Sequence, residues 1–179
     1  MEKVCFLIYS ALLVLTRAIY AKSDAAPVKN FGGSSYIFYS SNGNWYNWER
    51  SKTICELSGY NLVSIESREE WNFLNHTIQK EDITEYFIGL RKDPSTGVWR
   101  WLSDNSTVDA SNRGYWPWAK GEPNEGNGES NCAQMYRDYL KDFGRYNDIR
   151  CTSPLSHAGF ICEFKGGGGN RLLIHITPN

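Results

Sequence analysis

Residues 146–163 read YNDIRCTSPLSHAGFICE, a stretch with two short apolar or aromatic runs and a cysteine beside or inside each run. Runs of this kind are typical of strands, so we predict strands at Tyr146–Ile149 and Gly159–Phe164. A third strand is predicted just upstream, at Cys132–Tyr136. The C-terminal part of the chain is therefore expected to be a group of short strands.

Cysteine usage favours an extracellular protein. Cys5 lies in an apolar N-terminal stretch, and four further cysteines follow it, namely Cys55, Cys132, Cys151 and Cys162. An even set of four in an oxidising compartment predicts two disulfides, and the spacing alone leaves all three pairings open. A zinc site is disfavoured because the sequence has no CxxC and no paired histidine motif.

The N-terminus has the pattern of a secretory signal peptide. A charged start at Met1–Lys3 precedes the twelve nearly apolar residues of Val4–Leu15, and small residues suited to cleavage follow. We predict a signal peptide at residues 1–21, with the cut between 18 and 25, and hence a secreted, extracellular protein with no stable membrane insertion. A retained anchor is the less favoured alternative, because the apolar run is shorter than the roughly 20 residues that span a bilayer.

Composition fits one ordinary globular domain. The 179 residues are 41% hydrophobic and 22% charged, which excludes collagen, long coiled coils and bulk disorder. Lysine and arginine total 19 against 20 aspartate and glutamate residues, so there is no basic field to hold a phosphate backbone. We therefore expect no nucleic-acid partner.

Two helices are predicted upstream of these strands. Asn47 stands where a helix N-cap is expected, Gly59 ends that helix, and Cys55 lies on it. Ser67 and Glu70 form a capping-box signature that begins a second helix. The buried stripe of the second helix is predicted to be Trp71, Leu74 and Ile78.

The rest of the domain is predicted to be short strands and one long loop. Strands are predicted at Tyr36–Tyr39, Phe87–Leu90 and Trp99–Leu102. The loop Ser103–Asn131 has little periodicity, and loops of this length in compact domains are usually functional. Around the domain at 36–164 we predict a short polar lead at 22–35 and a Gly-rich linker and tail at 165–179.

Several short motifs follow one another along the chain. They are Trp48-x2-Ser51-x3-Cys55, FIGL at 87–90, Trp99 and Trp101, Glu122-Pro123-Asn124, Tyr146-Asn147-Asp148 before Cys151, and GFICE ending at Glu163. In this order they resemble the C-type lectin-like domain family over Tyr36–Phe164. The resemblance implies an α+β fold of two helices flanking antiparallel strands, with a long calcium-binding loop. It also implies the disulfides Cys55–Cys162 and Cys132–Cys151.

The long loop and the strand after it hold side chains that suit calcium, which prefers six to eight oxygen ligands. The resemblance implies that a cis peptide at Pro123 aims the oxygens on either side of it at the ion. It also implies that a sugar with two adjacent hydroxyls completes the coordination while it hydrogen bonds to the same side chains. The expected calcium and sugar ligands are Glu122, Asn124, Glu129, Asn147 and Asp148.

The order Glu122-Pro123-Asn124 indicates the class of sugar. It resembles the family members that bind mannose, fucose, glucose and N-acetylglucosamine, whereas Gln-Pro-Asp marks galactose binders. The expected partners are therefore glycans with mannose-type adjacent hydroxyls, and the expected function is sugar recognition without catalysis. One shallow site binds weakly, so we expect several sites to be held together, for example in a homo-oligomer.

The chain departs from the family pattern at a few positions. The third acidic ligand would fall at Ser130, and Glu129 lies one residue before it. Tyr146 replaces the usual tryptophan, which keeps an aromatic support. Lys92 and Thr96 stand where an auxiliary calcium site would need acids, so we expect one calcium ion.

Other interpretations remain open. The offset of Glu129 favours a lectin-like domain that binds a protein ligand without calcium or sugar. A glycoside hydrolase would use Glu122 and a second acid as a carboxylate pair, and it is the least favoured because asparagine partners suit a metal better. In the simplest alternative, Glu122–Asn131 is only a polar turn.

Two glycosylation sequons are expected on a secreted surface, at Asn75 and Asn105. The loop tryptophans Trp116 and Trp118 are expected to pack within the protein rather than stack on sugar rings.

Overall fold

The computed structural model describes residues 26–108, 117–138 and 141–166. The signal peptide expected at 1–21 and residues 167–179 of the expected tail lie outside the described residues. Two helices pack against one mixed sheet. No helix in this described part of the chain is long and apolar enough to cross a membrane.

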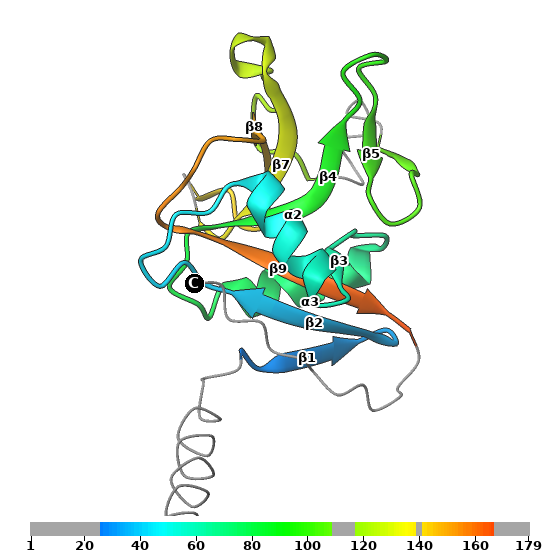
Figure 1. Cartoon of the computed structure of the whole chain (residues 1–179), viewed down its shortest axis with the longest axis vertical. Coiled ribbons are helices and arrows are strands. Elements are labelled where there is room, and N and C mark those ends of the chain that lie inside the picture. The colour runs from blue at the N-terminus through cyan, green and yellow to red at the C-terminus, as the bar shows by residue number, and fades with distance from the viewer. Residues whose placement is uncertain (1–25, 109–116, 139–140, 167–179) are drawn as a thin grey trace, which may run out of the picture.

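The predicted helices and strands occur in the predicted order, with further short strands between and before them, and Figure 1 shows their arrangement. The helices are α2 at Trp48–Leu57 and α3 at Arg68–Ile78. The strands are β1 at Val28–Phe31, β2 at Ser34–Tyr39, β3 at Asn61–Leu62, β4 at Glu85–Lys92, β5 at Trp99–Trp101, β6 at Thr107–Val108, β7 at Ser130–Tyr136, β8 at Tyr146–Arg150 and β9 at Ala158–Lys165. A short 3-10 turn spans Gly126–Gly128.

Both helices begin at the predicted caps. The Asn47 side chain accepts a hydrogen bond from the Arg50 amide (2.8 Å) at the start of α2. The Ser67 hydroxyl accepts one from the Glu70 amide (3.1 Å) at the start of α3. The Glu70 carboxylate accepts from the Glu66 amide (2.8 Å) rather than from Ser67. Local capping signals are therefore sufficient to position both helix starts.

The sheet is mixed rather than antiparallel throughout. Its main path runs β1-β2-β9-β4-β5-β6, with β7 paired to β4 and β8 paired to β7. β4 and β9 run parallel, with Glu85 opposite Ala158 and Phe87 opposite Phe160. The expectation of antiparallel strands is wrong for this pair, because the chain between them, β5 to β8, returns to the end of the sheet where β4 begins.

The sheet begins inside the segment predicted to be a polar lead, residues 22–35. β1 pairs with β2 through a two-residue turn at Gly32 and Gly33, whose φ angles are 58° and 89°. The ring of Phe31 stacks on that of Phe73 in α3, with centroids 4.9 Å apart. β1 is half exposed along its length, which is why its sequence looks like a loop.

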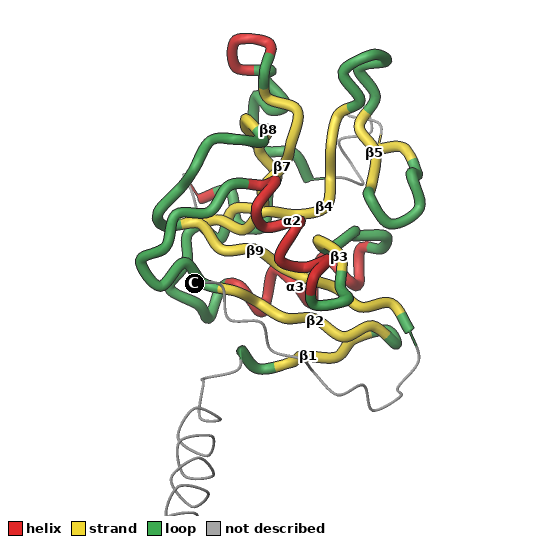
Figure 2. Tube along the Cα trace, viewed as in Figure 1, coloured by secondary structure: helices red, strands yellow, loops and turns green. Residues whose placement is uncertain are grey.

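Two disulfides join the elements as the resemblance implies. Cys55 of α2 is bonded to Cys162 of β9, and their Cα atoms are 5.4 Å apart. Cys132 of β7 is bonded to Cys151, just after β8, with Cα atoms 5.1 Å apart. The first bond ties α2 to β9 inside the core. The second ties β7 to the residue after β8, in the part of the molecule where loops connect β4, β5, β7 and β8 (Figure 2).

Aromatic side chains anchor the long loop to the sheet. Trp118 is 5% exposed and packs on Trp99 and Tyr146, at centroid distances of 4.9 and 6.0 Å. The Ala119 amide donates to the Tyr146 carbonyl (2.8 Å). The core position predicted for Trp118 is therefore confirmed, whereas Trp116 lies outside the described residues. This anchor brings the following residues of the loop to β8.

Candidate functional site

The Glu122-Pro123-Asn124 motif forms a turn held by its own side chains. The Glu122–Pro123 peptide is cis. The Asn124 side-chain amide donates to one carboxylate oxygen of Glu122 (3.0 Å), and the Asn124 backbone amide donates to the other (3.1 Å). The Asn124 side-chain oxygen accepts from the Gly126 amide (3.0 Å). The turn thus groups a carboxylate and a carboxamide at the surface of the loop.

Asp148 of β8 holds this turn in place. Its side chain is buried, and its two oxygens accept from the backbone amides of Asn124 (2.8 Å) and Glu125 (2.9 Å). Glu125 has a left-handed backbone conformation, with a φ of 61°, and successive amides then point at one carboxylate. Asp148 therefore lies with Glu122 and Asn124, although 24 residues separate it from Asn124.

The site holds two carboxylates close together. The pKa of Glu122 is raised to about 7, first by burial and then by the hydrogen bond and negative charge of Asp148. The Asn124 amides oppose this rise, because they stabilise the charged form of Glu122. A cation beside both carboxylates would relieve their repulsion, so the electrostatics of the cluster favour a positive ion.

Glu129 is engaged in an ion pair rather than in this cluster. Its carboxylate forms an ion pair with the Arg150 guanidinium (2.5 Å), and its side chain is 62% exposed. Ser130, the position that the family pattern would use, is buried in β7. The carboxylate expected from Glu129 is therefore engaged by Arg150 instead of by the cluster.

Asn147 lies next to Asp148 in β8 and pairs across the ladder with Gln134. Its side chain is partly exposed. Of the five expected ligands, the structure joins three by hydrogen bonds, places one next to Asp148 along β8, and pairs one with Arg150. These are Glu122, Asn124 and Asp148, then Asn147, then Glu129.

A buried lysine connects the loop to the sheet. Lys92 at the end of β4 is 7% exposed, and its ammonium contacts the Glu125 carboxylate (3.0 Å). Because the Glu125 amide also donates to Asp148, this ion pair links β4 to the cluster. Thr96 lies instead in an exposed turn, where its amide donates to Asp93 (3.3 Å). This ion pair was not predicted from the sequence. A lysine at the end of the mostly buried run FIGLRK could have indicated it, because a buried lysine needs an acidic partner.

The oxygen donors of the cluster fit calcium. Carboxylate and carboxamide oxygens are the ligands that calcium prefers. Within residues 26–108, 117–138 and 141–166, no group of three or more His, Cys, Asp or Glu side chains is arranged to hold a metal. Asparagine oxygens are therefore needed to complete a set, and the cluster supplies them.

The same geometry disfavours a hydrolytic pair of carboxylates. Glu122 and Asp148 both accept from the backbone amide of Asn124, at 3.1 and 2.8 Å. The two carboxylates of a glycoside hydrolase stand roughly 5 to 9.5 Å apart, on either side of the bond that is cleaved. The shared amide instead engages both carboxylates in the turn itself, which favours a binding role over a catalytic pair.

The two expected glycosylation sites differ in exposure. Asn75 lies in α3, where its side chain accepts a hydrogen bond from Gln79 (2.9 Å). Asn105 is exposed in the turn between β5 and β6, with a φ of 61°. Asn105 is thus the more accessible acceptor of the two.

Comparison with known sequences gives matches over most of the described residues. A family model described as the lectin C-type domain matches residues 44–164. CD209 antigen-like protein D of Mus musculus is 36% identical over 133 residues, which cover 74% of this chain and 48% of that protein. E-selectin of Bos taurus is 33% identical over 116 residues, which cover 64% of this chain and 22% of that protein. The chain thus spans half or less of the length of these relatives.

Solved structures with the same fold include two whose descriptions name a sugar. The C-type carbohydrate-recognition domain of cow CD23, in the presence of a GlcNAc2Man3 oligosaccharide, has a TM-score of 0.63 and 29% identity. That match covers 82% of this chain and 97% of the CD23 domain. The SPL-1 complex with GlcNAc has a TM-score of 0.63 and 28% identity, over 77% of this chain and 92% of SPL-1.

Proposed function

Since the chain belongs to the C-type lectin domain family, we propose that it is a calcium-dependent carbohydrate-binding protein. When bound, calcium offers coordination positions to two adjacent hydroxyls of a sugar. The residues that hold it in this proposal are Glu122, Asn124, Glu129, Asn147 and Asp148. Glu129 joins the other four by leaving its exposed ion pair with Arg150.

One observation carries the proposal. The carboxylates of Glu122 and Asp148 are held together because both accept from the Asn124 backbone amide (3.1 and 2.8 Å), and Glu122 also accepts from the Asn124 side-chain amide (3.0 Å). Burial and the negative charge of Asp148 raise the pKa of Glu122, so this place favours a positive charge. Two adjacent carboxylates repel each other, so a turn with only a structural role would not be expected to contain them.

The same side chains suit the hydroxyls of a sugar. A hydroxyl both donates and accepts hydrogen bonds. The ionised Glu122 carboxylate only accepts, and the Asn124 carboxamide donates through its nitrogen, which already contacts Glu122 at 3.0 Å. A hydroxyl that replaces this contact would find both an acceptor and a donor, which orients the ring.

We further propose mannose-type specificity, which covers mannose, fucose and N-acetylglucosamine. The order of Glu122 and Asn124 around Pro123 is the basis of this proposal. It is supported by the sugars in the two solved structures, an oligosaccharide of mannose and N-acetylglucosamine with CD23 and N-acetylglucosamine with SPL-1.

We also propose that the protein is secreted, that its partners are glycans on microbes or host glycoproteins, and that several copies act together. The signal-like segment at 1–21 and the two disulfides support an extracellular site of action. Glycosylation at Asn105, and at Asn75 where it is accessible, belongs to the same proposal. Avidity from a homo-oligomer would compensate for one shallow site per chain.

A second candidate is a lectin-like domain that binds a protein ligand without calcium or sugar. The observation in its favour is the Glu129–Arg150 ion pair, which occupies one expected ligand with a cation of the protein itself. In that case partner binding would be independent of calcium. Adding a chelator therefore distinguishes the two candidate functions, because it should abolish only the calcium-dependent one.

Retention on mannose resin tests the proposal. The mature, disulfide-bonded protein is loaded with calcium and eluted with a chelator, and galactose resin provides the contrast. We expect calcium-dependent retention on mannose only. Retention that survives the chelator, or none at all in folded protein, would contradict the proposal.

Matched variants locate the binding site. Glu122→Gln keeps the size of the side chain but removes a charged ligand, so we expect retention to be lost. Asp104→Asn removes a carboxylate of an exposed turn, where Asp104 accepts from the Ser106 amide (2.9 Å), and we expect normal retention. Both proteins are first compared by thermal unfolding, so that loss of binding is separated from loss of fold.

A further inference from the structure

We propose that Arg150 forms a second contact point beside the sugar site, which selects glycans that carry an acidic group, and that Glu129 covers this point when no calcium is bound. The proposal rests on the proposed function, because it concerns the same binding face. Its chemical class of ligand is a mannose-type glycan with a sulfate or carboxylate on or next to the bound sugar.

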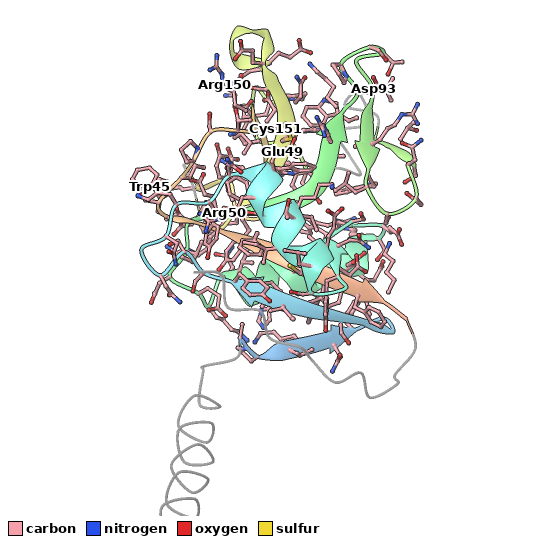
Figure 3. The ribbon with its side chains drawn as sticks, in the orientation of Figure 1. Trp45, Glu49, Arg50, Asp93, Arg150 and Cys151 are labelled. Atoms are coloured by element: carbon pink, nitrogen blue, oxygen red, sulfur yellow. A yellow bond between two sulfur atoms is a disulfide. The ribbon has the colours of Figure 1, made fainter. Side chains whose placement is uncertain are left out.

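The position of Arg150 supports this role. Arg150 ends β8, two residues after Asp148, and side chains two apart on a strand lie on the same face. It pairs across the ladder with Ser130, the residue after Glu129. Figure 3 shows Arg150 in the upper part of the molecule, beside β7. A glycan held at Asp148 would therefore extend over the Arg150 guanidinium.

The partner of Arg150 is easily exchanged. The Glu129 and Arg150 side chains are 62% and 47% exposed, so their ion pair lies in water. Exposed ion pairs contribute little to stability, and an oxyanion of a ligand can compete with the carboxylate. The guanidinium has a planar fork of donors that matches sulfate or carboxylate oxygens.

The two proposed roles of Glu129 are coupled. Glu129 cannot contact Arg150 and complete the calcium ligands at the same time. When Glu129 joins Glu122, Asn124 and Asp148, the Arg150 guanidinium loses its carboxylate and becomes available to a ligand. Anion binding at Arg150 then follows calcium binding rather than preceding it.

Other nearby cations are less suited to this role. The Lys92 side chain is only 9% exposed and is held by Glu125 (3.0 Å). Arg91 is shared between the Glu49 carboxylate (3.5 Å) and the ring of Trp48, whose centroid lies 5.6 Å from the guanidinium carbon. Arg150 is exposed, and its partner Glu129 is also an expected calcium ligand, so calcium binding would release it.

Affinities for neutral and acidic glycans test the proposal. Calorimetry with calcium compares a neutral mannose glycan with its sulfated form and with a form that carries a carboxylate sugar. We expect wild-type protein to bind at least one acidic form about three- to fivefold more tightly at low salt, a preference that salt reduces. The two acidic forms separate sulfate from carboxylate recognition.

The matched variants are Arg150→Gln and Arg50→Gln. Arg50 lies on α2, where its guanidinium lies over the Tyr46 ring at 5.4 Å and donates to the Trp45 carbonyl (3.3 Å). We expect the ratio of acidic to neutral affinity to fall to about one in Arg150→Gln and to persist in Arg50→Gln. A wild-type ratio of one, or an unchanged ratio in Arg150→Gln, would overturn the inference. Failure to bind any of the three glycans would instead overturn the proposed function.

A second readout needs no sugar. The Nε–H resonance of Arg150 is followed by NMR while calcium is added to the free protein. If Glu129 leaves Arg150, this resonance shifts with the same calcium dependence as the amides of Asn124 and Glu125. An Arg150 resonance that stays constant at calcium saturation would contradict the exchange.

Discussion

Asp148 determines the geometry of the candidate site more than any other residue. It is buried at 5% exposure, it comes from a strand, and its two oxygens accept from the backbone amides of Asn124 and Glu125. Glu122 lies against it, and its pKa is raised to about 7 by burial and by Asp148. The site therefore combines one carboxylate fixed by the backbone with one that titrates near neutral pH.

Calcium affinity is expected to fall below pH 7. Glu122 has a raised pKa, so it is mostly protonated below about 7, and a cation has to displace that proton. The dissociation constant should rise by up to about tenfold for each pH unit below 7, because one proton is exchanged for each ion. Calorimetry between pH 5 and 8, in buffers with different ionisation enthalpies, measures both affinity and proton release. A calcium dissociation constant that does not change with pH, without proton release, would contradict the predicted role of Glu122.

The Lys92–Glu125 ion pair is expected to steady the loop. Lys92→Met keeps the apolar stem and removes the ammonium, so the Glu125 amide should leave Asp148 more often. Hydrogen exchange at Glu125 should become about two- to fivefold faster in the calcium-free protein. Lys52→Met is the control, because Lys52 pairs with Glu56 on the exposed side of α2 (2.7 Å) and should leave that exchange unchanged. Equal exchange rates at Glu125 in wild type and Lys92→Met would exclude this role.

A helix or strand can be predicted from the sequence when the signal for it is local. Asn47 and Ser67 mark helix starts because a cap involves only the next three residues. β1 was not expected, because its side chains alternate weakly and the signal lies in the Gly32-Gly33 turn. β6 is two residues long and is defined by pairing with β5 rather than by its own pattern. The parallel pairing of β4 with β9 has no local signal at all.

Trp118 is the residue that joins the loop to β8. Trp118→Ala would remove a buried ring from contact with Trp99 and Tyr146, which should lower the free energy of unfolding by about 3 to 5 kcal/mol. Trp45→Ala is the control, because Trp45 is 59% exposed and projects from the left side of the molecule in Figure 3. Urea unfolding measures both. Similar losses in the two variants would show that the Trp118 anchor does not hold the loop.

At the scale of the whole molecule, the site is assembled from segments that are distant in the chain. Glu122, Asn124 and Asp148 are recognisable from the sequence because their motifs lie at family spacings, and the structure brings them together. The partner of Glu129 could not be found in this way, because Arg150 becomes its neighbour only through the pairing of β7 with β8.

The two disulfides are expected to have different roles. Cys55–Cys162 closes a separation of 107 residues and Cys132–Cys151 one of 19, so chain entropy predicts contributions of about 5 and about 3 kcal/mol. Replacing the second pair by alanine should leave the protein folded and weaken calcium binding, since this bond links β7 to the end of β8. Replacing the first pair should destabilise the entire domain. Thermal unfolding and calcium titration of both variants compare these effects. Identical stability and calcium affinity in the two variants would contradict different roles for the two disulfides.

Calcium titration by calorimetry shows directly whether Glu122, Asn124 and Asp148 form a calcium site. Chelator-treated wild-type protein at pH 8 should show one binding event per chain. Asp148→Asn, shown to be folded by its thermal transition, should show none in the same range. A wild-type protein that takes up no calcium, or an Asp148→Asn protein that binds it equally well, would contradict the account.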